Sequence, residues 1–146
     1  MKSSRLLVSL IALPAVSLHA AAPPPPAAVV DAAKFPTLQA AFDAVPEAGG
    51  LVQLPPGTFE LTRPLVLGRG NTRVTGAGAA THLVNKNTDG QPALIVRPPT
   101  LDQDRRARLW RVQLGNFRVT GNTNSGDGIF AEGVQEFFIQ GLTVSA

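Results

Sequence analysis

Apolar residues in this chain recur at every second position over short runs, which is the pattern of β-strands that bury one face. The phrase Asn-x-Arg-Val-Thr-Gly occurs at residues 71–76 and again at 116–121, and a looser version, Gly-Leu-Thr-Val, occupies residues 141–144. Another alternating pair lies midway between the first two copies. The resulting ladder steps by 22, 23 and 25 residues through Thr72/Val74, Leu94/Val96, Phe117/Val119 and Leu142/Val144. A strand repeat of this length is typical of solenoids, in which each unit buries its apolar face against its neighbours.

Each repeating unit contains about three short strands separated by corners rich in Pro, Gly or Asn. Alternation is clear at residues 52–54, 59–61 and 65–67, with Pro55-Pro56-Gly57 as one of the turns. We therefore predict an all-β fold, a right-handed parallel β-helix solenoid of about four coils, with neighbouring coils about 4.8 Å apart. A β-sandwich is the alternative, but it would need hairpins with two-residue Asn-Gly or Asp-Gly loops. The candidate dipeptides, Asp89-Gly90 and Asp127-Gly128, do not repeat at hairpin spacing.

One segment before the strands has helical periodicity. Its apolar residues stand at i, i+3, i+4 and i+7, which places on one helix face the residues Leu38, Ala41, Phe42 and Val45. Thr37 is a suitable N-cap, and Pro46 ends the helix. Because this amphipathic helix directly precedes the strands, we predict that it caps the apolar N-terminal end of the β-helix.

The N-terminus has the three-part pattern of a secretory signal peptide. Lys2 and Arg5 flank the start of an apolar run that ends at Leu18, and small residues follow. The run is too short to span a membrane, which takes about 20 apolar residues; a buried N-terminal helix is the alternative. We predict a secreted or periplasmic protein with cleavage near Ala20, divided into a signal peptide at 1–22, a Pro/Ala-rich spacer at 23–33 and the β-helix domain at 34–146.

Charge and cysteine content exclude several kinds of partner and site. The chain has 13 Lys and Arg against 10 Asp and Glu, and the excess falls to one when Lys2 and Arg5 are set aside with the signal peptide. A nucleic-acid partner would need a clustered basic face with stacking aromatics. The densest basic run, within residues 105–111, instead neighbours Asp102 and Asp104, and we interpret residues 98–108 as a solvated, protruding loop. The sequence contains no cysteine, which excludes disulfides and thiolate metal sites.

Two segments resemble the pectate lyase superfamily. Residues 35–44, Phe-Pro-Thr-Leu-Gln-Ala-Ala-Phe-Asp-Ala, and 49–59, Gly-Gly-Leu-Val-Gln-Leu-Pro-Pro-Gly-Thr-Phe, are similar to its N-terminal cap and first coil, and residues 75–78 and 126–129 to its turn-to-strand phrases. The resemblance covers residues 35–146. It implies a protein that acts on or binds an acidic, uronate-rich polysaccharide, by β-elimination or glycosidic hydrolysis. The superfamily also includes epimerases and phage tailspikes, so the resemblance indicates the fold more sharply than the reaction.

The tetrapeptide Asn87-Thr88-Asp89-Gly90 matches a motif that carries a catalytic Asp in polygalacturonases. The Ile that follows this motif in that family, its paired aspartates and its Gly-His-Gly phrase are missing from this sequence. Glycoside hydrolysis needs a second carboxylate facing the first. We therefore interpret the tetrapeptide as a surface turn.

Asp127 and Glu132 are the catalytic candidates. Alternation turns Ile129 and Ala131 inward, so Asp127 and Glu132 could project near one another beside Phe130, which would be a platform for a sugar ring. Paired acids could act as acid and base, or hold Ca²⁺ together with a uronate; the alternative is that Asp127 only stabilises its turn. No metal triad can be assembled from this sequence and no cofactor is assigned, so Ca²⁺ is expected only if a site is completed beyond this chain.

Arg73, Arg97 and Arg118 are candidate substrate-binding residues. Each stands next to an inward-facing ladder residue, so successive coils would present one guanidinium each to a polymer of carboxylated sugars. The alternative is that these arginines only solvate the outer face of the strands.

The last residues, 142–146, form a strand of the repeat with no capping unit after it. We therefore expect the domain to be C-terminally incomplete and to expose an apolar end that self-associates. The sequence leaves open whether the chain is an enzyme. A non-catalytic β-helix adhesin or surface carbohydrate-binding module is the alternative function.

Overall fold

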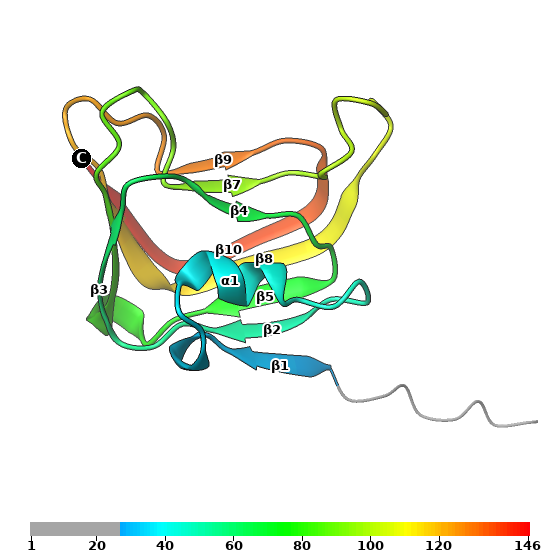
Figure 1. Ribbon diagram of the computed structural model, residues 1–146, viewed down its shortest axis with the longest axis horizontal. Coiled ribbons are helices and arrows are strands. Elements are labelled where there is room, and N and C mark those ends of the chain that lie inside the picture. Colours follow the sequence, from blue (N-terminus) through cyan, green and yellow to red (C-terminus); the bar gives the residue numbers. More distant parts are fainter. Residues whose placement is uncertain (1–26) are drawn as a thin grey trace, which may run out of the picture.

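In the computed structural model, residues 27–146 form ten strands, one α-helix and two short 3-10 helices (Figure 1). The predicted signal peptide and residues 23–26 of the predicted spacer lie outside the described residues. The rest of the spacer segment contains strand β1, Ala28–Asp31, and the 3-10 helix η1, Ala32–Lys34. β1 pairs with β2, so this part of the segment belongs to sheet A.

The strands form two sheets in which every pairing is parallel. Sheet A has seven strands, in the order β1-β2-β5-β8-β6-β3, with β10 added beside β8. Sheet B has three strands, in the order β4-β7-β9. Besides β1, the bounds are β2 Gly50–Gln53, β3 Gly57–Leu61, β4 Leu65–Leu67, β5 Thr72–Thr75, β6 Thr81–Asn85, β7 Leu94–Val96, β8 Leu109–Thr120, β9 Ile129–Ala131 and β10 Val134–Ser145, and the second 3-10 helix, η2, is Gly78–Ala80.

Alternation along the strands selects the side chains that enter the core between the two sheets. Val52, Val74 and Leu114 occupy matching positions in β2, β5 and β8, and all three are inaccessible to solvent. Leu67 and Leu94 of sheet B are equally buried. Burying a side chain of this size contributes roughly 1.5–3 kcal/mol, so this shared core is what holds the sheets together.

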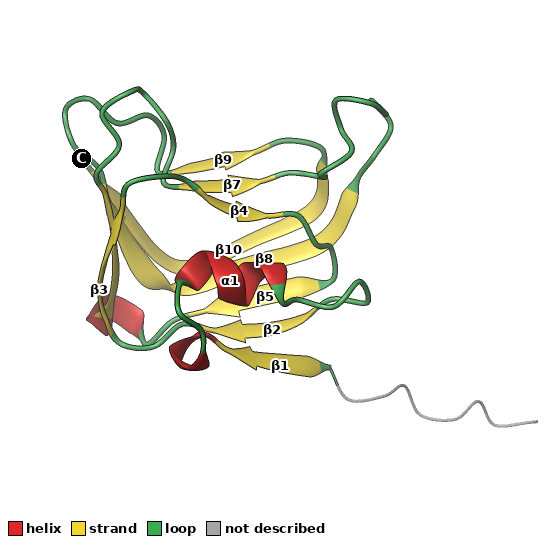
Figure 2. Ribbon diagram, viewed as in Figure 1, coloured by secondary structure: helices red, strands yellow, loops and turns green. Residues whose placement is uncertain are grey.

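Strand β8 makes sheet A curl around the core. Residues 112–115 pair with β5, and residues 118–120 pair with β6. Asn116 lies between these two parts with a φ of 58°, a left-handed conformation that Asn adopts more readily than most residues. The strand turns there, and the result is an open, curled sheet with sheet B on its inner side (Figures 1 and 2).

The all-β class agrees with the sequence, but the predicted right-handed β-helix solenoid of about four coils is wrong. The error lies in the register. The ladder placed Val74, Leu94 and Val119 in one stack, whereas Val74 pairs with Leu114, and Leu94 belongs to sheet B. The ladder pair Phe117/Val119 belongs to one continuous strand, β8, which joins β5 to β6 within a single open sheet.

The predicted helix is present as α1, Leu38–Asp43, which lies against β4 rather than capping a stack of coils. Thr37 is its N-cap, and its hydroxyl oxygen accepts a hydrogen bond from the Ala40 amide at 3.1 Å. Val45, the last residue of the predicted apolar stripe, is buried beyond the end of the helix. Within residues 27–146, no helix has the length and apolarity needed to cross a membrane.

Gln39 fastens α1 to the edge of sheet B. Its Nε2 donates to the carbonyl oxygen of Val66 at 3.0 Å, and its Oε1 accepts from the Val66 amide at 2.8 Å. Val66 lies in β4, the edge strand of that sheet. The carboxamide therefore takes the place that a peptide group of another strand would occupy, and it closes this edge to further pairing.

Three residues other than glycine adopt left-handed backbone at one aligned corner. Asn71, Arg111 and Glu136 have φ angles of 50°, 55° and 57°, and they directly precede residues that pair in register. Arg111 Nε donates to Asn71 Oδ1 at 3.1 Å and lies 3.9 Å from Glu136 Oε2. Arg and Glu seldom adopt this conformation, so these contacts help to hold a strained corner.

Candidate functional site

The outer face of sheet B carries one apolar side chain from each strand. Val66 of β4, Ile95 of β7 and Phe130 of β9 pair in register, and their neighbours along β4 and β7 face the core. Val66 is 42% exposed and Phe130 is 40% exposed. We call these three residues the apolar row. With Pro99 and other neighbours they line a shallow pocket of about 310 Å³, and such a surface suits the apolar face of a sugar ring.

Arg97 and Glu132 stand side by side at one end of the apolar row. Each is the first residue after its strand, and the ladder continues through them, because Glu132 N donates to Val96 O at 3.0 Å and Arg97 N donates to Leu67 O at 3.1 Å. Arg97 Nε donates to Glu132 Oε2 at 2.9 Å. Parallel pairing thus brings together two charges that are 35 residues apart in the sequence.

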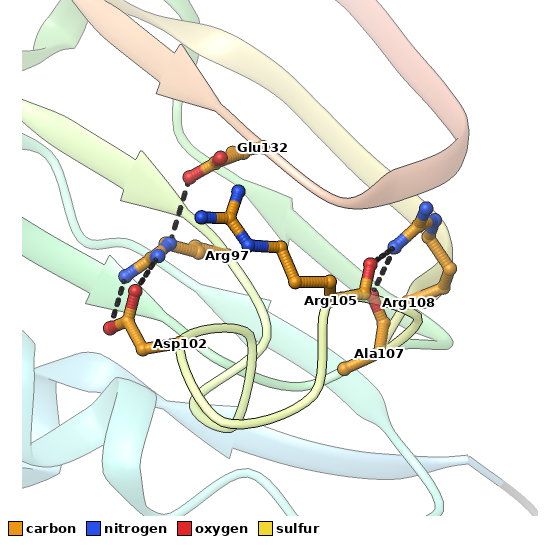
Figure 3. Close-up of polar contacts among 6 residues, drawn as sticks. All are labelled: Arg97, Asp102, Arg105, Ala107, Arg108 and Glu132. Atoms are coloured by element: carbon orange, nitrogen blue, oxygen red, sulfur yellow. Dashed lines mark hydrogen bonds and ion pairs between the residues drawn. The ribbon is translucent and has the colours of Figure 1, made fainter.

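Asp102 completes a three-residue cluster with Arg97 and Glu132 (Figure 3). Arg97 Nη1 donates to Asp102 Oδ2 at 3.0 Å, and Nη2 pairs with the other carboxylate oxygen. The hydrogen bonds from Arg97 lower the pKa of the Asp102 carboxyl, and the positive charge of Arg97 lowers it further. Hydrogen bonding to Asp102 is also the main cause that raises the pKa of Arg97.

The loop of residues 98–108 is folded back on itself, and it carries Asp102 into the cluster. Leu101 anchors it, because its side chain is only 7% exposed. Asp104 organises the tip, since its Oδ1 accepts from the Arg106 amide at 2.9 Å and its carbonyl oxygen accepts from the Ala107 amide, also at 2.9 Å. The loop therefore has a defined conformation, and it lies beside the outer face of sheet B.

This loop and the end of β9 enclose a second pocket, of about 500 Å³, which we call the basic pocket. Arg105 and Arg108 line it together with the Arg97 cluster. Arg108 Nη1 donates to the carbonyl oxygens of Arg105 and Ala107 at 2.9 and 2.7 Å, and the Arg105 side chain extends toward Arg97 and Glu132 (Figure 3). Three guanidinium groups face two carboxylates here, so the pocket carries a net charge of +1.

The structure separates the two predicted catalytic acids. Asp127 precedes β9 and Glu132 follows it, so the two lie at opposite ends of an extended strand. At about 3.3 Å per residue their backbones are roughly 16 Å apart. Asp127 is exposed just before β9, and its carbonyl oxygen accepts a hydrogen bond from the Ala93 amide at 3.0 Å. Of the predicted site residues, the structure brings together Arg97, Phe130 and Glu132.

The other two predicted arginines lie away from this site. Arg73 faces outward from β5 beside Gln113, and Arg118 faces outward from the second half of β8 beside His82. Both belong to sheet A, so they do not form one row with Arg97. His82 Nε2 lies 2.9 Å from Thr120 Oγ1. Desolvation lowers the pKa of His82, and the charge of Arg118 lowers it further.

The tetrapeptide that begins at Asn87 is a turn held by buried amides. The backbone N–H of Asn87 donates to the side-chain Oδ1 of Asn85 at 2.9 Å, and both residues are almost fully buried. Asn122 Nδ2 donates to the carbonyl oxygens of both residues, at 2.7 and 2.9 Å. Asp89 points into solvent from this turn. Asn122 therefore ties together the loops that follow β6 and β8.

Metal ligands do not gather in the part of the chain that the structure describes. Within residues 27–146, no group of three or more His, Asp or Glu side chains could hold a metal ion. Ca²⁺ binding therefore stays a prediction from the resemblance.

Asp102, Arg105 and Arg108 are the site residues that the sequence analysis missed. In the sequence these residues are visible as a basic run next to an acidic residue. Only the folded loop shows that their side chains converge on the basic pocket.

Comparison with known proteins supports the fold alone. No protein-family model matches the sequence, and no curated protein matches it. A solved structure, ORF18 of Geobacillus virus E2, is similar over 78% of this chain with a TM-score of 0.71 and 22% sequence identity. The chain spans a quarter of the length of that protein.

Proposed function

We propose that this chain binds a uronate-rich polysaccharide along the outer face of sheet B. The observation that carries the proposal is the junction at Arg97 and Glu132, where the apolar row meets the basic pocket. A sugar ring would pack on Phe130 and its neighbours in the row, while Arg105 and Arg108 would pair with carboxylates of the polymer. The resemblance of residues 35–146 to the pectate lyase superfamily supports the same class of ligand.

Binding fits the geometry better than cleavage does. Glycosidic cleavage needs two carboxyl groups that face the scissile bond. Glu132 is held in an ion pair with Arg97, and Asp127 lies at the other end of β9. An extracellular polymer also requires an exported protein, in accord with the signal peptide predicted at residues 1–22.

The test is a calorimetric titration of the full chain with oligogalacturonate, which measures the binding affinity. Arg105→Ala combined with Arg108→Ala should weaken binding about 3- to 10-fold, because exposed ion pairs contribute roughly 0.2–1 kcal/mol each. Phe130→Ala should weaken it by a similar factor. The affinity should also fall with added salt, since the screening length is about 8 Å at physiological ionic strength.

Arg106→Ala is the matched control, since Arg106 lies in the same loop and does not line the basic pocket. This variant should bind like the parent chain, and neutral oligogalactose should bind far more weakly than the uronate. Equal binding of both sugars, or an equal loss in the Arg106 control, would remove the proposal. Release of unsaturated or reducing ends from polygalacturonate would instead favour catalysis.

A further inference from the structure

A third pocket lies beside α1, at the β4 edge of sheet B. It has a volume of about 300 Å³, and its walls include Phe42 of α1, Gly68 and Arg69 directly after β4, and Pro99 of the 98–108 loop. We call it the Arg69 pocket. The basic pocket instead has walls from the residues that follow β9. The two pockets therefore lie at opposite ends of the order β4-β7-β9.

The pocket over the apolar row joins these two pockets into one groove. It shares Val66 and Pro99 with the Arg69 pocket, and it shares Arg97 and Glu132 with the basic pocket. The groove thus crosses all three strands of sheet B. Two strand spacings amount to about 10 Å, so the groove is about this long or longer.

Gly68 keeps the groove open at its β4 end. It is the first residue after β4, as Arg97 is after β7 and Glu132 is after β9. A Cβ atom at Gly68 would stand 3.4 Å from Pro99 Cδ, so a larger side chain would fill the space between β4 and the loop. Gly68 is not among the residues with positive φ. The backbone therefore does not require glycine here, and what the glycine provides is space.

The Arg69 pocket offers one cation and one anion to a ligand. Among residues 27–146, no carboxylate forms an ion pair with Arg69. Asp43 also lines the pocket, and its Oδ1 accepts a hydrogen bond from Gln39 Nε2 at 2.8 Å. A free guanidinium suits a carboxylate, and the remaining lone pairs of Asp43 suit a hydroxyl donor. A uronate ring carries both of these groups.

We propose that the Arg69 pocket is a second charged subsite for the same polymer, an inference that rests on the function proposed above. An oligouronate would lie across the strands, with one carboxylate on Arg69, a middle ring on the apolar row and another carboxylate in the basic pocket. One sugar ring cannot reach both ends of the groove, so the ligand needs at least three rings. Once one end is bound, the second contact is intramolecular, and this raises the affinity for longer chains.

The test compares galacturonate oligomers of two and four rings by calorimetric titration of the full chain. The tetramer should bind at least 10-fold more tightly than the dimer, which fills only the basic pocket and the apolar row. Arg69→Ala should weaken tetramer binding about 2- to 5-fold, the loss of one exposed ion pair, and leave dimer binding unchanged. Gly68→Val, which fills the groove beside Pro99, should have the same selective effect.

Arg63→Ala is the matched control. Arg63 is exposed just before β4, and it lines a separate pocket whose walls do not include Pro99. This variant should bind both oligomers like the parent chain, and thermal melts report that all three variants are folded. Equal affinity for dimer and tetramer, or an equal loss in the Arg63 and Arg69 variants, would overturn the second subsite and leave binding at the basic pocket intact. Failure of both oligomers to bind the parent chain would remove the proposed function itself, and the subsite with it.

Discussion

At the scale of single residues, Arg97 joins three separate parts of the chain. Its guanidinium donates to Glu132 after β9 and to Asp102 in the 98–108 loop, while its own backbone follows β7. With its donors used in this way, Arg97 positions the loop, and in the proposed binding mode the contacts with the ligand fall to Arg105 and Arg108. One guanidinium group can bind both carboxylates because it is planar and its N–H donors point in fixed directions.

This arrangement predicts how Asp102 titrates. The folded-state pKa of its carboxyl lies below the ordinary 3.8, so the pairing stabilises the fold above that value and is lost as pH falls through the folded pKa. An NMR titration should place the Asp102 midpoint below 3.8, and Arg97→Gln should return it toward 3.8 and weaken amide protection in residues 98–108. Arg106→Gln, in the same loop, should change neither. A midpoint at or above 3.8 in the parent chain would contradict the assignment.

Sequence reasoning found the strand residues of the site but not those of the loop. Phe130 and Glu132 follow from period-two alternation, because a strand fixes the side to which each residue points. Asp102 and Arg105 have no such period, and the direction of their side chains depends on Leu101 being buried and on Asp104 capping the turn. Asp127 and Glu132 were predicted to lie close together, but the extended backbone of β9 between them separates residues five apart and cannot bring them together.

At the scale of elements, the two sheets treat their edges differently. The β4 edge of sheet B is sealed by Gln39 of α1, whereas β10 of sheet A pairs only with β8 among residues 27–146. Helix and strand were both predicted from their periodicity. The packing of α1 against β4 was not predicted, because it depends on the carboxamide of Gln39, whose donor and acceptor match the spacing of a peptide group.

Gln39→Ala should therefore destabilise the fold. The change removes two hydrogen bonds to Val66, each with a net contribution of roughly 0.5–1.5 kcal/mol, and partial exposure favours the lower end of that range. We expect a loss of about 1–2 kcal/mol in the free energy of unfolding, measured by urea denaturation, with faster amide exchange at Val66. Gln53→Ala, an exposed strand glutamine, is the control and should cost far less. Equal effects would show that Gln39 does not seal the edge.

At the scale of the whole molecule, one apolar core runs from β1 to β8 and receives side chains from both sheets. The register of that core is where sequence reasoning failed. The repeated phrase at residues 71–76 and 116–121 marks similar corners, yet Val74 pairs with Leu114 because loops of unequal length separate the strands. The ladder, with steps of 22, 23 and 25 residues, assumed nearly equal units and so could not reveal these unequal loops.

A shared core predicts a single cooperative transition. Far-UV circular dichroism reports both sheets, whereas fluorescence reports Trp110, the one tryptophan of the chain, at the start of β8. At one fixed protein concentration the two melts should coincide. Phe117→Ala should shift both together by about 3–5 kcal/mol, since Phe117 is 1% exposed. Two separated midpoints would show that the sheets unfold independently.

The parallel pairing of the strands also governs how quickly this chain acquires its structure. The pair Gly50–Thr72 already closes 22 residues, and Thr72–Val112 closes 40. Forming contacts this distant costs loop-closure entropy before the contacts contribute any favourable energy. We therefore expect folding to take milliseconds to seconds rather than microseconds. During synthesis, β5 waits with an open edge until β8 has been made, some 40 residues later. The nascent chain is therefore vulnerable to mispairing at the open edge of β5 throughout that interval.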